Sequence, residues 1–146
     1  MVEFLIDRAS GLPAYLQVVR HVREALRLGW LRPGDQLPTV REVVTSNGVN
    51  PNTVLKAYRE LELAGLVEAR QGAGTFIVAT LGSAPPESMA RLHDQLSGWV
   101  REAHAAGLEN EDIEALLRAV LTDTPLPSNG SGNKRRSRQA KGDGSE

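Results

Sequence analysis

The stretch that most constrains the fold is residues 37–65, which read LPTVREVVTSNGVNPNTVLKAYRELELAG. Thr39 and Glu42 form the pattern T-x-x-E just before an apolar run, and this pattern is a capping box at a helix N-terminus. In a capping box the two residues satisfy each other's backbone N–H groups, so two of the free donors of the first turn gain partners. The stretch therefore predicts a helix that begins at Val40.

A second helix is predicted after a short break. Gly48 can end the first helix, because glycine adopts the left-handed conformation that follows many helix C-termini. Asn50 is a preferred N-cap and Pro51 is tolerated at the first helical position, so the next helix start is marked twice. Gly65 stops this helix. Helix, tight turn and helix together form the layout of a helix-turn-helix.

The segment before this pair is expected to supply a further helix. Pro13 opens it, and its apolar residues fall on one stripe at helical spacing. A short strand at residues 4–6 is expected ahead of it, and core positions are expected for Trp30 and Leu31 behind it.

The segment after the pair is expected to form a hairpin. Residues 66–70 and 75–78 alternate in polarity and contain β-branched residues, and the glycine-rich turn QGAG separates them. The turn is not a phosphate-binding loop of the P-loop type, because no G-K-[ST] follows it and no helix starts there. Three helices and a two-stranded wing predict a winged helix-turn-helix over residues 1–80, in a chain that is mainly α with a small β-hairpin.

Residues 81–86 form a linker rich in proline and serine, and residues 87–124 carry two amphipathic helices. Two such helices cannot bury both apolar faces as an isolated hairpin, whereas a four-helix bundle with a second chain would bury them. A homodimer through residues 87–124 is therefore expected, and packing against the chain's own winged domain is the alternative. Two helices are too few to enclose a large ligand pocket, so a small-molecule effector, if present, would bind at the dimer interface.

Charge divides the chain into blocks that bear on its partners. Residues 1–80 carry nine basic against eight acidic side chains, residues 81–127 carry three against eight, and residues 128–146 carry five against two. The acidic middle block would repel phosphates, so a nucleic-acid surface is expected in the first block. Residues 125–146 have few apolar side chains and are expected to be a disordered tail.

Several classes of protein are excluded or disfavoured. The chain has no cysteine, which excludes disulfides and thiolate metal sites. No apolar run approaches the ~20 residues that span a bilayer, and no signal-peptide core is evident, so a cytoplasmic protein without membrane contact is expected. His93 and His104 lie about 16 Å apart along one helix, too far to share a metal. No catalytic constellation is recognisable, so we expect no enzyme activity, no cofactor and no metal site.

The motifs together resemble one family. The segments PGDQLPTVRE, VNPNTV, AYRELE and GAGTF, spread over residues 10–79, are similar to the DNA-binding domain of GntR-type bacterial transcription regulators. The short remainder resembles the YtrA-like subfamily, whose members add only a pair of helices. The resemblance implies a winged helix-turn-helix that binds double-stranded DNA.

The chemistry of DNA reading selects candidate residues at the helix starts. Asparagine can bond adenine N6 and N7 together, and lysine can donate to guanine, which makes Asn50, Asn52 and Lys56 candidates along with Thr53. Thr39 and Arg41 lie at the start of the preceding helix, where free N–H groups and a guanidinium suit a phosphate.

The resemblance supports part of this set. In similar proteins the positions matching Arg41, Asn50, Asn52 and Thr53 contact DNA, as does the wing near Gln71 and Gly72. Many relatives outside the subfamily have arginine at the position of Pro51, so their operator sequences do not transfer to this chain.

Two functions from different classes follow. The first is a sequence-specific transcription regulator, a dimeric repressor that binds a two-fold operator. The second is a protein-interaction module whose C-terminal helices recruit a partner, with weak or no specific DNA binding; the near-neutral charge of residues 1–80 motivates it. Loss of operator binding on replacing Arg41 and Asn52 with alanine would distinguish the first from the second.

Overall fold

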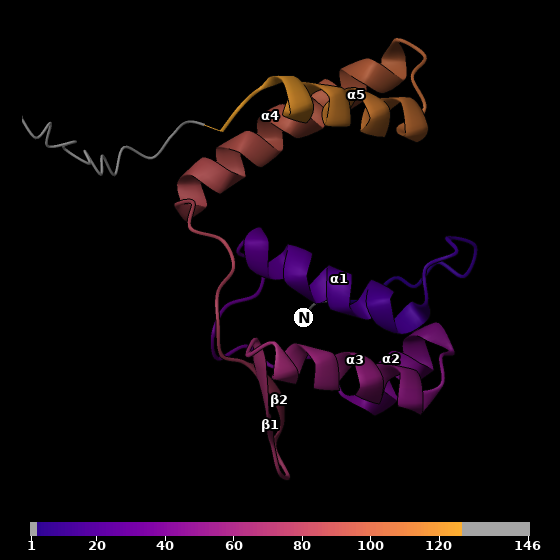
Figure 1. Cartoon of the computed structure of the whole chain (residues 1–146), viewed down its shortest axis with the longest axis vertical. Helices are drawn as coiled ribbons and strands as arrows, with labels where there is room; N and C mark the ends of the chain where they lie inside the picture. Colours follow the sequence, from indigo (N-terminus) through magenta and orange to yellow (C-terminus); the bar gives the residue numbers. More distant parts are fainter. Residues whose placement is uncertain (1–2, 127–146) are drawn as a thin grey trace, which may run out of the picture. The chain divides into compact units, whose positions relative to one another are not determined.

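The computed structural model describes residues 3–126 and contains five helices and one two-stranded sheet within that range. The helices are α1 (Ala14–Arg27), α2 (Val40–Asn47), α3 (Pro51–Leu63), α4 (Pro86–Ala105) and α5 (Asn110–Asp123), and the strands are β1 (Val67–Arg70) and β2 (Gly74–Ile77). Figure 1 shows α1, α2 and α3 close together, with the hairpin projecting beyond them. The sequence-based expectation of a mainly helical winged helix-turn-helix is confirmed.

The chain divides into two compact units, Met1–Gly98 and Trp99–Glu146, and α4 runs across the boundary. The core of the first unit is built around α3, which packs against α1, α2 and β1. Its buried residues are Phe4, Val18, Val22, Ala25, Leu26, Leu31, Leu37, Val43, Val54, Ala57, Tyr58, Leu61, Leu66, Val67 and Ile77. The apolar stripe expected for α1 supplies four of these residues, and one side of α3 supplies another four.

The wing is an antiparallel hairpin with a third segment beside it. Val67 pairs with Ile77 at its base and Arg70 pairs with Gly74 near its tip. On the other side of β2, Leu37 N–H donates to the Thr75 carbonyl and Ile77 N–H donates to the Asp35 carbonyl, both at 2.8 Å. The loop before α2 therefore fixes the root of the wing.

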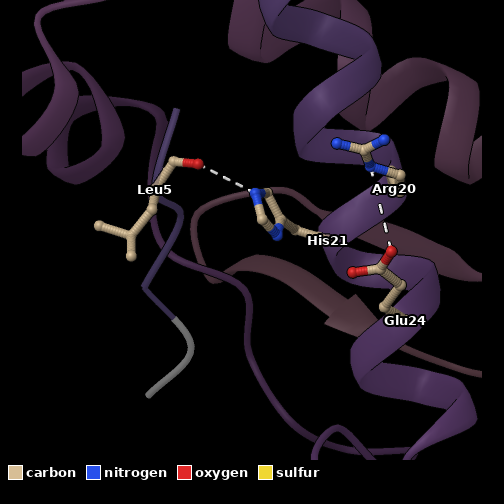
Figure 2. Close-up of polar contacts among 4 residues, drawn as sticks. All are labelled: Leu5, Arg20, His21 and Glu24. Atoms are coloured by element: carbon tan, nitrogen blue, oxygen red, sulfur yellow. Dashed lines mark hydrogen bonds and ion pairs between the residues drawn. The ribbon is translucent and has the colours of Figure 1, made fainter. Parts of the chain in front are cut away.

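The N-terminal arm, residues 3–12, lies on α1 without forming the strand expected at residues 4–6. Phe4 is buried in the core, and His21 Nε2 donates to the Leu5 carbonyl at 2.9 Å, as Figure 2 shows. The neighbouring Arg20–Glu24 pair in the same view is exposed and 4.0 Å apart, so it adds little stability. The arm contacts α1 through side chains, including the hydrogen bonds of Gln17, and such contacts form no strand ladder.

The expectation that Trp30 lies in the core is wrong. Leu31 is buried as expected, but the Trp30 side chain is 62% exposed. Gly29 has φ +75° and follows the end of α1, and the reversal there sends the next two side chains to opposite environments. Ala64, which directly follows α3, is also exposed.

In the second unit, the end of α4 and α5 form a hairpin around Ala103 and Ile113, both buried. The N-cap of α5 is Glu109, whose backbone N–H donates to the Asp112 carboxylate at 2.9 Å. Asn110 is the first helical residue, and its side-chain oxygen lies 2.8 Å from His104 Nε2. Within residues 3–126, no helix is long and apolar enough to cross a membrane. The predicted tail falls largely on residues 127–146, which lie outside the described part.

One buried hydrogen bond ties the start of α2 to α3. The Tyr58 hydroxyl donates to the Pro38 carbonyl, just before the cap of α2. Burial, with a further contribution from the Glu42 carboxylate, raises the pKa of Tyr58 well above its usual value. The hydroxyl therefore stays protonated, and the stability that it contributes is complete below about pH 10 and is lost as the pH rises above that value.

We predict that Tyr58→Phe lowers the free energy of unfolding by about 1–3 kcal/mol, because the buried Pro38 carbonyl loses its partner. The matched control is Tyr15→Phe, which also removes one phenolic hydroxyl, but one that makes no hydrogen bond within residues 3–126. Urea unfolding at pH 7 measures both. Equal losses in the two variants would contradict the role of this bond.

Candidate nucleic-acid interface

The start of α2 has the predicted capping box. Thr39 Oγ1 accepts from the Glu42 N–H at 3.1 Å, and Glu42 Oε2 accepts from the Thr39 N–H at 2.9 Å. Thr39 is exposed, and its hydroxyl keeps a proton to donate while its oxygen serves the cap. The first-turn N–H groups of Val40 and Arg41 precede the first intrahelical bond, so they remain available to an anion despite the Glu42 carboxylate nearby.

The turn between α2 and α3 also forms as predicted. Gly48 has φ +64° and ends α2, with its N–H donating to the Val44 carbonyl at 2.8 Å. Asn50 caps α3, and Pro51 is its first residue. An added Cβ at Gly48 would lie 3.2 Å from Arg8 Nη2, so both the backbone conformation and a close neighbour favour glycine here.

The two asparagines of α3 differ in what they have left to offer. Asn50 Oδ1 accepts the Asn52 N–H at 2.9 Å, so the cap holds this side chain and occupies one of the two acceptor positions of its oxygen. The Asn52 side chain is exposed and makes no hydrogen bond within residues 3–126. Asn52 alone of the pair therefore has a side-chain amide that is not committed to the helix cap and can turn to make the two-bond contact that reads adenine.

The outer face of α3 is the side turned away from the core. Six residues line a shallow hollow on it: Asn52, Leu55, Lys56, Arg59, Glu60 and Leu63. The Lys56 ammonium lies 3.9 Å from the centre of the Tyr15 ring, which restrains that side chain toward α1. Thr53 is half-buried and lines a different hollow together with Asn50.

The wing contributes the remaining predicted positions. Gln71 and Gly72 are exposed at the tip, and Gly72 has φ +74°. They line one hollow with Thr39, so the structure brings the cap of α2 and the wing tip together. Arg70 lies over the Phe76 ring at 4.6 Å, which places a guanidinium on the hairpin next to the tip.

Gly74 fixes the wing against the loop before α2. It has φ +124°, and an added Cβ would lie 2.4 Å from Gln36 Nε2. The same Gln36 amide donates to the Ala73 carbonyl at 3.1 Å. The positive φ of Gly74, which other residues rarely adopt, and the close Gln36 amide together favour glycine at this position.

The N-terminal arm supports the turn of the helix-turn-helix, a role that the sequence patterns did not reveal. Arg8 Nη2 donates to the Asn47 and Gly48 carbonyls at 3.3 and 2.9 Å, where α2 ends. A cation at a helix C-terminus is favourable because the last carbonyls lack intrahelical partners. Arg8 also lines the hollow that holds Asn50 and Thr53, which places its positive charge beside the start of α3.

Gln17 anchors this arm. It is only 2% exposed, and its amide N–H₂ donates to the Asp7 and Leu12 carbonyls and to Ser10 Oγ, while its oxygen accepts the Asp7 N–H at 2.8 Å. Gln17 lies outside the apolar stripe of α1, so periodicity gave no sign of its burial. Its only sequence signal was a polar residue next to that stripe.

Arg41 is exposed on α2 and lines none of these hollows. No group of histidine and carboxylate side chains within residues 3–126 is arranged to hold a metal ion. The exposed surface around α2, α3 and the wing thus offers amide, hydroxyl, guanidinium and backbone N–H donors. Such a surface suits phosphate and base edges rather than bond-breaking chemistry.

Comparison with known proteins agrees with this geometry. Residues 14–77 match the family described as bacterial regulatory proteins, gntR family. The chain is 38% identical over 119 residues to the HTH-type transcriptional repressor YtrA of Bacillus subtilis, covering 81% of this chain and 92% of that protein. It is also 38% identical over 118 residues to the HTH-type transcriptional regulator Rv1152 of Mycobacterium tuberculosis, covering 81% and 93%.

A solved structure, a transcriptional antiterminator from Listeria monocytogenes, aligns with a TM-score of 0.53 at 32% identity, covering 84% of this chain and 92% of that one. These relatives are transcription proteins and not enzymes, in agreement with the expectation from the sequence. The chain therefore belongs to the GntR family of bacterial regulatory proteins, DNA-binding transcription regulators with a winged helix-turn-helix.

Proposed function

We propose that this chain is a cytoplasmic, dimeric transcription repressor that binds a two-fold operator in double-stranded DNA. The observation that carries the proposal is the outer face of α3, which keeps Asn52 and its neighbours free of the core while the opposite face is fully buried. Repression is the role that the name of the similar YtrA protein suggests.

The proposed contacts are of two kinds: phosphate contacts that position the protein on DNA and base contacts that read the sequence. Arg41, Thr39 and the wing residues Gln71 and Gly72 would bind phosphates on either side of the groove, because they supply N–H, O–H and guanidinium donors at the rim of the site. Asn52 would read a base pair in the major groove. Asn50, Thr53 and Lys56 would add contacts around it, Asn50 from the orientation that its cap on α3 fixes.

The dimer would form through residues 87–124. Large apolar side chains remain exposed on both helices, namely Leu92, Leu96, Leu116, Val120 and Leu121. A two-fold bundle with the same helices of a second chain would remove this surface from water. It would also hold two copies of α3 for half-sites whose centres are about 34–36 Å apart or a multiple of that.

The direct test is selection of bound sequences from a random duplex library. A palindromic consensus bound ~10³-fold or more tightly than random DNA is expected. Weak binding without any enriched sequence, removed by moderate salt, would contradict specific recognition and leave only backbone attraction.

We predict that replacing the two asparagines changes different properties: Asn50 affects the stability of the fold and Asn52 affects operator binding. Asn50→Ala removes the cap of α3 and lowers the free energy of unfolding by about 0.5–2 kcal/mol, and Asn50→Ser restores most of that loss. Asn52→Ala leaves stability unchanged but weakens operator binding by about 5- to 150-fold, the value of one two-bond base contact. Urea unfolding and a fluorescence anisotropy titration separate the two. Unchanged operator affinity in Asn52→Ala would refute the base contact.

We also predict that Val120→Asp converts the dimer to a monomer. Val120 is 52% exposed on the apolar side of α5, so a carboxylate there would be buried without a partner in the dimer. Ala115→Asp is the matched control, because it adds the same group to the opposite, exposed side of α5. Sedimentation velocity reads the mass of each variant. A dimeric Val120→Asp protein would place the interface elsewhere.

A further inference from the structure

Leu55 is an apolar side chain among the polar groups of the outer face of α3. It is 41% exposed, while the neighbouring Val54 is fully buried. It lines the same hollow as Asn52 and Arg59. An isolated exposed leucine is common on protein surfaces, so the place of Leu55 carries more information than its exposure.

Helix geometry places Leu55 beside the residue assigned to base reading. Leu55 follows Asn52 by three positions, which is about 4.5 Å along the axis and about 60° around it. Successive base pairs are separated by about 3.4 Å, so the two side chains are spaced to meet the same or adjacent base pairs. Lys56, on the other side of Asn52, is restrained toward Tyr15 and leaves this side of the hollow to Leu55.

The major groove offers one apolar feature to such a side chain. Each thymine presents its C5-methyl group there, whereas cytosine presents an amine donor at the equivalent edge. Leucine has no hydrogen-bonding group, so it gains from contact with the methyl group and loses where it covers the cytosine amine. An adenine held by Asn52 also requires a thymine in the same base pair.

We propose that Leu55 determines operator specificity by packing on the C5-methyl group of a thymine, in or next to the base pair that Asn52 reads. The proposal rests on the function proposed above and adds a base identity to it. Each half-site of the operator then carries one thymine whose methyl group contributes to binding.

The experiment replaces single thymines of the selected operator with 2′-deoxyuridine, which removes the methyl group and keeps the base pair. With the full-length protein, one position in each half-site is expected to weaken binding about four-fold, the value of burying one methyl-sized group. Deoxyuridine at that position in both half-sites should weaken operator binding by about 15-fold.

The variant Leu55→Ala should bind the thymine operator more weakly than the original protein. It should lose no further affinity when deoxyuridine replaces thymine at that position. Leu63→Ala is the matched control, since Leu63 is 88% exposed on the same face, about 12 Å further along α3. Leu63→Ala should lose affinity at the same deoxyuridine positions, and by the same factors, as the original protein. Urea unfolding of both variants, which alter exposed side chains, checks that the fold is intact.

The outcomes distinguish this inference from the proposed function. The role of Leu55 is overturned if the operator is bound specifically but no thymine is methyl-sensitive. It is also overturned if Leu55→Ala loses as much affinity with deoxyuridine as the original protein does. Either result leaves the proposed regulator function standing. Failure to select any operator overturns the proposed function and the inference with it.

Discussion

The fold depends on the burial of one side of α3. Val54, Ala57 and Leu61 have no exposed surface, and with Tyr58 they form the stripe around which α1, α2 and β1 pack. Because side chains at these spacings share one side of a helix, the rest of α3 must face outward. The requirement for a core therefore also creates the outer surface that we propose reads DNA, and changes of its exposed residues would alter sequence preference with little effect on stability.

Precise placement of that outer face comes from polar contacts at the margins of the core. Tyr58 holds the residue before the cap of α2, Gln17 holds the N-terminal arm, and Arg8 of that arm holds the turn. Tyr58 and Gln17 are buried, so loss of either hydrogen-bond partner would cost about 1–3 kcal/mol, whereas the Arg8 contacts are exposed and contribute less. Hydrophobic burial alone is non-directional and would leave the orientation of the turn less well defined.

Unlike the first unit, the second unit leaves much of its apolar surface exposed. Its hairpin buries little more than Ala103 and Ile113, while Leu116, Val120 and Leu121 remain exposed. In the dimer that we propose, association of two chains would supply both the missing burial and the spacing of the two α3 helices. Stability and operator geometry would then depend on the same contact.

The sequence by itself determined the element order and the local signals. The capping box at Thr39, the glycine after α2 and the asparagine–proline start of α3 are interactions among near neighbours, so they can be recognised without the rest of the chain. Tertiary structure decided the exposure of Trp30, the burial of Gln17 and the contact of Arg8 with the α2–α3 turn, some 40 residues away in the sequence. These features depend on which groups meet after folding, and periodicity along the chain carries no information on such partners.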